Sequence, residues 1–157
     1  MNDASNGGTG GNGADTRQFL LQQLFIKDLS FEAPNAPVTL QGGAGEPDVK
    51  LNLRHSARAL DGDAYEVVLH LSVHAELGGK TVFLAELDQA GLFVIKGYKD
   101  EERKQLLGVY CPNTLFPYAR EAISSTVARG GFPPLMLQPI NFEALYAQAA
   151  AQKEAQA

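Results

Sequence analysis

The sequence has little of what several classes of protein depend on. It has one cysteine, no apolar run long enough to span a bilayer, and no basic and apolar signal segment at its N-terminus. These absences argue against an intrachain disulfide framework and a transmembrane helix, and they predict a cytoplasmic location. Basic residues are also few, 13 against 18 acidic ones, which leaves a net charge of −5. Because nucleic-acid-binding proteins carry clustered Lys and Arg, we expect no nucleic-acid partner and a preference for basic partners.

The composition divides the 157 residues into one domain and two tails. Residues 1–16 offer almost no side chain that could be buried, so we predict a disordered N-terminal tail. Residues 17–150 form the predicted domain, and residues 151–157 a flexible tail that continues a helix and then frays. The run from Gly8 to Gly13 has the spacing of a dinucleotide fingerprint, but no strand precedes it. We interpret that match as accidental.

The first two-thirds of the domain alternates apolar and polar residues, which is typical of strands. We predict strands at residues 17–32, 49–54, 66–77 and 81–96, with a long loop rich in Pro and Gly at 33–48. The pair Gly78 and Gly79 supplies a tight turn between the last two strands. The sheet is therefore expected to be antiparallel.

Two of these strands carry more apolar residues than one buried face requires. The first is apolar on both sides in its N-terminal half, and the fourth is apolar on both sides. Such strands need cover on both faces or a partner chain. In the first strand the period of two puts Phe25, Leu29 and Phe31 on one side and Asp28, Ser30 and Glu32 on the other.

Helical spacing begins at Asp100. We predict a short helix over 100–110, an interruption at Cys111 to Asn113, and a second helix with Thr114 as its N-cap. After a Pro-rich connector, Asn141 is expected to cap a last helix. The predicted fold class is α+β, a four-stranded antiparallel sheet followed by helices packed on one face.

Three groups of residues could carry chemistry, and each has a simpler explanation. Cys111 could be a nucleophile, but free Cys is often buried and no partner stands at a recognisable spacing. His70 and His74 share one strand face but lie roughly 13 Å apart, too far to bind one metal, so we expect solvated histidines. Asp61 and Asp63 lack the other ligands of a calcium loop and predict a turn. We therefore expect a binding protein without metal or cofactor, and no enzyme.

Five segments, read in order, resemble the SecB family of protein-export chaperones. They are FIKDLSFEAPNAP at 25–37, YEVVL at 65–69, GVYCPNTLFPYARE at 108–121, RGGFPPL at 129–135 and PINFEAL at 139–145. The likeness covers about residues 17–150. It implies a chaperone that holds unfolded precursor proteins in the cytoplasm and delivers them to the SecA motor. It also implies a homotetramer, a dimer of dimers, with no direct insertion into the membrane.

The resemblance and the apolar pattern together predict three surfaces. The client-binding groove is expected to be lined by Phe31, Val38, Leu40, Val49, Leu51, Leu135, Met136, Leu137, Phe142 and Tyr146. The surface that docks the basic tail of SecA is expected to comprise Asp28, Glu32, Leu84 and Glu86. The tetramer interface is expected to include Ala85, Leu87, Gln89, Cys111, Phe116 and Tyr118.

Three alternatives remain open at this point. A SecB-like chaperone could serve a dedicated stress or toxin–antitoxin partner in place of general export. From other classes, the chain could be an enzyme of α+β fold with a small-molecule pocket, or a purely structural oligomerisation module. Only a holdase should slow the refolding of an unrelated client without nucleotide.

Overall fold

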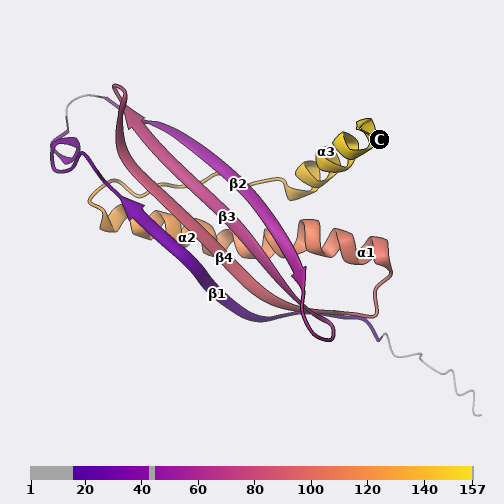
Figure 1. The fold of residues 1–157 in the computed structure, drawn as a ribbon. Coiled ribbons are helices and arrows are strands. Elements are labelled where there is room, and N and C mark those ends of the chain that lie inside the picture. Colours follow the sequence, from indigo (N-terminus) through magenta and orange to yellow (C-terminus); the bar gives the residue numbers. More distant parts are fainter. Residues whose placement is uncertain (1–15, 43–44, 157) are drawn as a thin grey trace, which may run out of the picture.

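A computed structural model describes residues 16–42 and 45–156 of the chain (Figure 1). The predicted N-terminal tail, apart from Thr16, and the glycine run within it lie outside these residues. The same holds for two residues of the predicted long loop, 43 and 44.

Four antiparallel strands form a single sheet, as the sequence predicts. They are β1 (Gln18–Glu32), β2 (Asp48–Ala59), β3 (Ala64–Leu77) and β4 (Lys80–Lys96), in the spatial order β1-β4-β3-β2. Gly78 and Gly79 both have positive φ and make the β3–β4 turn, where a side chain would strain the backbone. The β2 strand is longer than predicted because its polar second half pairs with β3 as far as Ala59.

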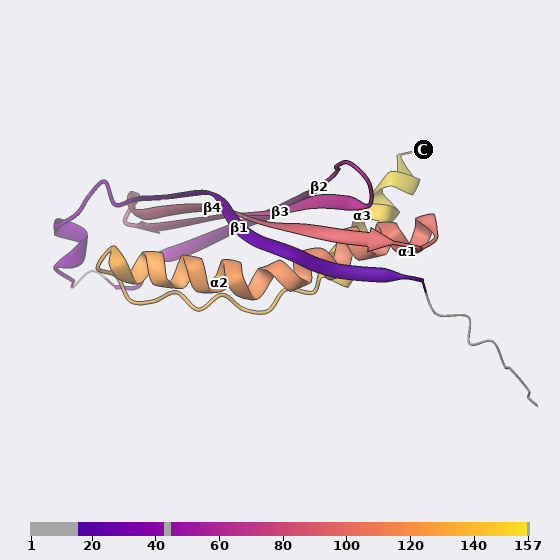
Figure 2. The same cartoon turned by 90° about the horizontal axis from the view of Figure 1, so that it is seen from below.

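One face of the sheet is buried and the other is open. Most odd-numbered residues of β3 and β4 are buried, among them Leu69, Leu71 and Leu87, and they form the core with α2 (Cys111–Arg129). Figure 2 shows this helix lying along one side of the sheet. We call the opposite side, which carries the even-numbered residues of β3 and β4, the open face.

Two β-bulges shift the register of β1 and correct one sequence prediction. Pairing with β4 skips a residue between Leu21 and Gln23 and again between Ile26 and Asp28. Phe25 pairs with Ala90 and so lies on the open face, whereas Leu29 and Phe31 lie on the helix-covered face. The prediction that all three share one side was wrong, because a bulged residue reverses the alternation beyond it.

The predicted break at Cys111 to Asn113 was also wrong. A short helix, α1 (Asp100–Gln105), runs through a π-helical segment (Leu106–Tyr110) directly into α2. Thr114 is not an N-cap, because its hydroxyl donates to the carbonyl of Tyr110 inside the helix at 2.7 Å. A proline ring clashes with the carbonyl four residues before it, which for Pro112 belongs to Gly108, and the wider π turn accommodates it there.

The continuous helix also changes the position that its second proline occupies. Pro117 lies inside α2 and not in the first turn of a helix that begins after Thr114. Pro112 lies where the π-helical segment passes into α2, so neither proline stands at the start of the continuous helix.

The chain returns along α2 before it ends in a separate helix. The connector after α2 runs back beside that helix, and α3 (Phe142–Ala155) begins near the π-helical segment (Figure 2). Asn141 caps α3 as predicted, since its side chain accepts a hydrogen bond from the Ala144 N–H at 3.0 Å. The helix continues past residue 150 into the segment assigned to the C-terminal tail.

Candidate functional site

An aromatic cluster closes the end of the molecule where α2 stops. Phe31 of β1 stacks on Phe83 of β4 at 6.0 Å between ring centroids, and Phe132 contacts both rings at 6.4 and 5.3 Å. The Phe31 ring lies against Gly130, where an added Cβ would overlap it. Gly130 therefore lets the ring approach the end of the helix, and the cluster forms a firm floor beneath the crossover loop.

The crossover loop between β1 and β2 holds apolar side chains above this floor. It contains a 3-10 turn (Val38–Leu40), and Leu40 lies beside Gly131 at the end of α2. Asn35 ties the loop to the β3–β4 turn by donating to the carbonyl of Thr81 at 2.8 Å. Val38 remains 71% exposed, so the loop presents apolar surface to solvent.

Edge strand β2 and the connector extend this apolar surface. Val49 and Leu51 pair with Ala75 and Val73, which places them on the helix-covered face, yet both are exposed because α2 does not reach the sheet edge. Met136 in the connector is 72% exposed. We call the exposed predicted residues of this region the apolar strip: Val38, Leu40, Val49, Leu51 and Met136.

The remaining predicted groove residues are more enclosed. Phe31, Leu135 and Tyr146 are half-buried against the core, while Leu137 and Phe142 are buried within one chain. Because these side chains are enclosed, they would form the bottom of the groove or support it, and would not form its exposed edge. Only movement of the connector or of α3 would bring the two buried side chains into contact with a client.

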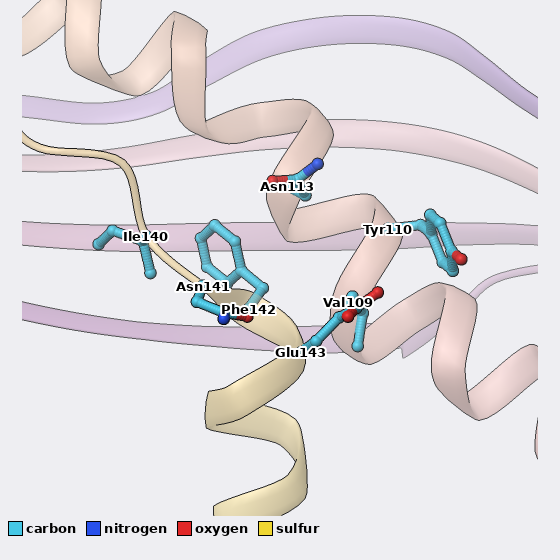
Figure 3. A pocket seen from close by; sticks show the side chains of 7 residues that line it. All are labelled: Val109, Tyr110, Asn113, Ile140, Asn141, Phe142 and Glu143. Carbon is cyan, nitrogen blue, oxygen red and sulfur yellow. The ribbon is translucent and has the colours of Figure 1, made fainter.

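The base of α3 is held by two aromatic contacts. The Tyr146 ring packs against Gly108 so closely that an added Cβ would come within 2.5 Å of it. Phe142 meets Phe116 of α2 edge-on at 6.0 Å. Beside these contacts lies a cavity of about 280 Å³ between the π-helical segment and the start of α3 (Figure 3). Its lining comprises Val109, Tyr110, Asn113, Ile140, Asn141, Phe142 and Glu143.

The four residues predicted to dock a basic tail come together on the open face. Glu32 of β1 pairs directly with Leu84 of β4, and Asp28 lies four pairs further along the same edge. Glu86 lies midway between these pairs, opposite Ser30. The structure thus places all four residues on one face, as strand parity predicts.

Sequence reasoning missed a further carboxylate on this face. Asp88 pairs with Asp28 across β1 and β4, and its carboxylate contacts His70 Nδ1 at 2.5 Å. The even numbering that Asp88 shares with Leu84 and Glu86 was the available signal.

Most of the six predicted interface residues are buried in a single chain. Ala85, Leu87 and Gln89 of β4 lie on the helix-covered face, and Cys111 and Phe116 are buried on α2. Tyr118 is the exception, at 48% exposed. The buried five can affect assembly by setting the position of α2, whereas Tyr118 has surface to offer a partner.

The residues considered for chemistry have structural settings instead. Burial raises the pKa of Cys111 to about 12, so its thiol is protonated at neutral pH and is not an activated nucleophile. His70 and His74 remain partly exposed to solvent, and their ring nitrogens also contact Asp88 and Thr81. Asp61 and Asp63 flank Gly62 in the β2–β3 turn, as predicted.

The described part of the chain lacks a metal-binding group and a membrane-spanning helix. Residues 16–42 and 45–156 contain no group of three or more His, Cys, Asp or Glu side chains placed to hold a metal ion. In those same residues, every helix is too short or too polar to cross a membrane.

Comparison with known proteins gives a consistent result. A family model for SecB, described as preprotein translocase subunit SecB, matches residues 12–153. The protein-export protein SecB of Pseudomonas savastanoi is 49% identical over 148 residues, which cover 94% of this chain and 91% of that protein. The protein-export protein SecB of Nitrosococcus oceani is 48% identical over 138 residues, covering 87% and 84%.

A solved structure shares the fold. A SecB-like chaperone of Mycobacterium tuberculosis, in complex with a peptide from an antitoxin, matches with a TM-score of 0.65 at 20% identity. The match covers 78% of this chain and 90% of that one.

Proposed function

This chain belongs to the SecB family, and we propose that it is a holdase that binds unfolded precursor proteins in the cytoplasm and keeps them competent for export. The observation that carries this function is the apolar strip. An unfolded client exposes apolar side chains without a folded shape to recognise, so a holdase needs apolar surface that remains open in its own folded state. The strip lies where the crossover loop, the start of β2 and the end of α2 meet (Figure 1).

Several weak contacts acting together would hold a client. Each buried client side chain contributes only about 2 kcal/mol, so useful affinity requires that an extended segment fill several positions of the strip at once. The aromatic cluster beneath Leu40 would give the strip a rigid floor, while the loop above it would adapt to different side chains.

A refolding assay tests the holdase. We expect excess protein to slow the recovery of a slowly folding client in the absence of nucleotide, because binding removes the client's unfolded state from the folding reaction. The readout is the rate of recovery of the client's native fluorescence or activity. An unchanged rate would favour a small-molecule enzyme or a structural module.

A role in general export is favoured over a dedicated antitoxin partner, because the chain is more similar in sequence to the protein-export relatives than to the antitoxin-bound chaperone. The relatives at 48–49% identity are named as protein-export proteins, whereas the antitoxin-bound chaperone is 20% identical and shares the fold alone. Delivery to the SecA motor is accordingly part of the proposal.

The docking surface for the motor is proposed to be the carboxylates around Leu84 on the open face. Glu86 stands between the pairs formed by Asp28 and Glu32, so a basic peptide could meet all three. We expect Glu86→Lys to abolish detectable binding of the basic tail of SecA by calorimetry, because it replaces an attraction by a repulsion at the centre of the patch. Client holding should be unchanged. Equal binding by wild type and variant at low salt would place the docking site elsewhere.

A homotetramer, arranged as a dimer of dimers, is proposed from the apolar surface that one chain leaves open. Ile26 and Leu29 of β1 point to the helix-covered face but are exposed, as are Tyr110 and Tyr118 on α2. Burying such surface between copies is favourable. Native mass spectrometry at micromolar concentration is expected to give four subunits, and a stable monomer would contradict the assembly.

A further inference from the structure

A row of basic residues lies on the open face, at the opposite edge of the sheet from the docking carboxylates of β1. Lys50, Arg54 and Arg58 follow one another at every fourth position of β2. Their partners across β3 are His74, His70 and Glu66, all on the open face. Since β1 and β2 are the two edges of the sheet, this basic row and the acidic residues of β1 face solvent at opposite edges.

Part of this row borders a hollow of about 680 Å³. Its lining comprises Lys27, Arg54, His55, Ser56, Ala57, Arg58, Glu66, Val68, His70 and Asp88. The hollow therefore spans all four strands at the mid-part of the sheet. No residue predicted to bind client or SecA lines it.

Ion pairs hold the walls of the hollow and leave one cation without a counter-charge. Glu66 lies between Lys27 and Arg58, with nitrogen–oxygen distances of 3.2 Å to each, and its side chain is only 13% exposed. Asp88 is engaged by His70. Among the residues that the structure describes, no carboxylate pairs with Arg54. Burial lowers the pKa of His55, so its imidazole is neutral at pH 7 and adds no charge.

The docking carboxylates on β1 and β4 also lack cations to pair with in the described part of the chain. Within the described part of the chain, Asp28, Glu32 and Glu86 have no ion-pair partner. The open face is thus divided by charge, with unpaired carboxylates on β1 and β4 and an unpaired guanidinium on β2. The pairs formed by Glu66 and by Asp88 lie between them.

We propose that the hollow binds the carboxylates of an acidic segment in the same partner chain whose basic segment docks around Leu84. This inference rests on the proposed docking function. It predicts that the partner carries a basic segment and an acidic segment close together in its sequence, in either order. Neighbouring strands are about 4.8 Å apart, so two strand spacings, roughly 10 Å, separate β4 from β2. Arg54 is level with Asp88, which lies four positions from Leu84 and so about 13 Å along the strand. The two charged sites are therefore about 16 Å apart, and an extended peptide crosses that distance with about five residues.

Charge favours a peptide over a nucleic acid. A phosphate backbone would meet one unpaired cation in the hollow but three unpaired carboxylates beyond it, on a chain with a net charge of −5. A peptide of mixed charge can match both halves. Charged residues also protect an edge strand from pairing with other sheets, but that role needs neither a hollow nor an unpaired Arg54.

Three synthetic peptides of equal length test the inference. The first joins a basic segment to an acidic one through about five neutral residues, the second replaces the acidic segment by a neutral one, and the third is acidic alone. We expect the first to bind about fivefold more tightly than the second at low salt, because each exposed ion pair contributes roughly a twofold to fivefold gain. Raising the salt should remove the difference. Equal affinities of the first two peptides at low salt would overturn the inference.

Variants assign the gain to the hollow. Arg54→Ala should reduce the difference between the first two peptides to less than about twofold and leave the second peptide's affinity unchanged. Lys80→Ala, which removes a positive charge at the β3–β4 turn outside the hollow, should keep the difference. Loss of the gain in both variants alike would show a general charge effect and overturn the assignment.

Nuclear magnetic resonance separates failure here from failure of the docking site. If the second peptide does not bind wild type, the proposed docking surface is wrong, but the acidic peptide still reports on the hollow. The acidic peptide should shift the backbone amide signals of residues 54–58 in the wild-type protein and should leave the signals of residues around Leu84 unchanged. Absence of these shifts would overturn the inference. Stronger shifts of the same amides by a single-stranded oligonucleotide would assign the hollow to nucleic acid and overturn it as well.

Discussion

Leu87→Asp is expected to lower the free energy of unfolding by about 4 kcal/mol or more. Leu87 is fully buried on β4 beneath α2, so the substitution removes apolar contacts and places a carboxylate among the apolar side chains of the core. A loss of this size is a large fraction of the stability of a typical domain. Chemical denaturation followed by circular dichroism measures it.

The same substitution on the other face of the strand is a matched control. Leu84→Asp changes a half-buried residue three positions away, on the open face, and should leave the free energy of unfolding within about 1 kcal/mol of wild type. Loss of the tetramer is expected for Leu87→Asp only as a consequence of subunit destabilisation. A Leu87→Asp subunit of wild-type stability that no longer assembles would show that this residue contacts another copy directly.

Replacing three residues of the apolar strip should weaken client binding by about 100-fold. Val38→Ser, Leu40→Ser and Met136→Ser each remove roughly 1 kcal/mol of apolar contact with a bound client, and about 3 kcal/mol corresponds to a factor of about 100. The fold should tolerate the change, because Val38 and Met136 are more than 70% exposed and Leu40 is 43% exposed in the free protein. Fluorescence anisotropy of a labelled unfolded client gives the affinity, and thermal unfolding gives the stability.

Leu60→Ser serves as the control for this triple variant. Leu60 is also exposed, but it lies in the β2–β3 turn at the other end of the sheet, away from the strip. Its replacement should leave client affinity unchanged. An equal loss of affinity in both proteins would mean that exposed apolar residues act without regard to position. A large fall in the unfolding temperature of the triple variant would instead identify its residues as core.

Local pattern was enough to predict those parts of the site that depend on neighbours in sequence. The alternation in β3 and β4, the turn at Gly78 and the cap at Asn141 were all correct, because side-chain periodicity and capping act within a few residues. Strand parity also put Leu84 and Glu86 on one face, since no bulge interrupts β4 between them.

Predictions that depended on packing between distant segments were less complete. Nothing near Cys111 in sequence shows that a π-helical turn lets the helix continue through Pro112, and the close packing of Tyr146 against Gly108 is a contact over 38 positions. Likewise, the sequence shows that Leu137 and Phe142 are apolar, but it does not show whether an apolar residue lines a groove or belongs to the core. That distinction depends on where α2 and the connector lie.

By itself, the sequence determined the α+β class, the antiparallel pairing of β3 with β4 and the membership of a chaperone family. Only the tertiary structure decided how β1 lies against β4, because each bulge shifts the pairing by one residue, and the bulge between Ile26 and Asp28 puts Phe25 and Leu29 on opposite faces. It also decided the division of the open face by charge. Residues on β1 and β2 that are tens of positions apart share that face through the strand order β1-β4-β3-β2, and a pattern that repeats every two residues carries no record of that order.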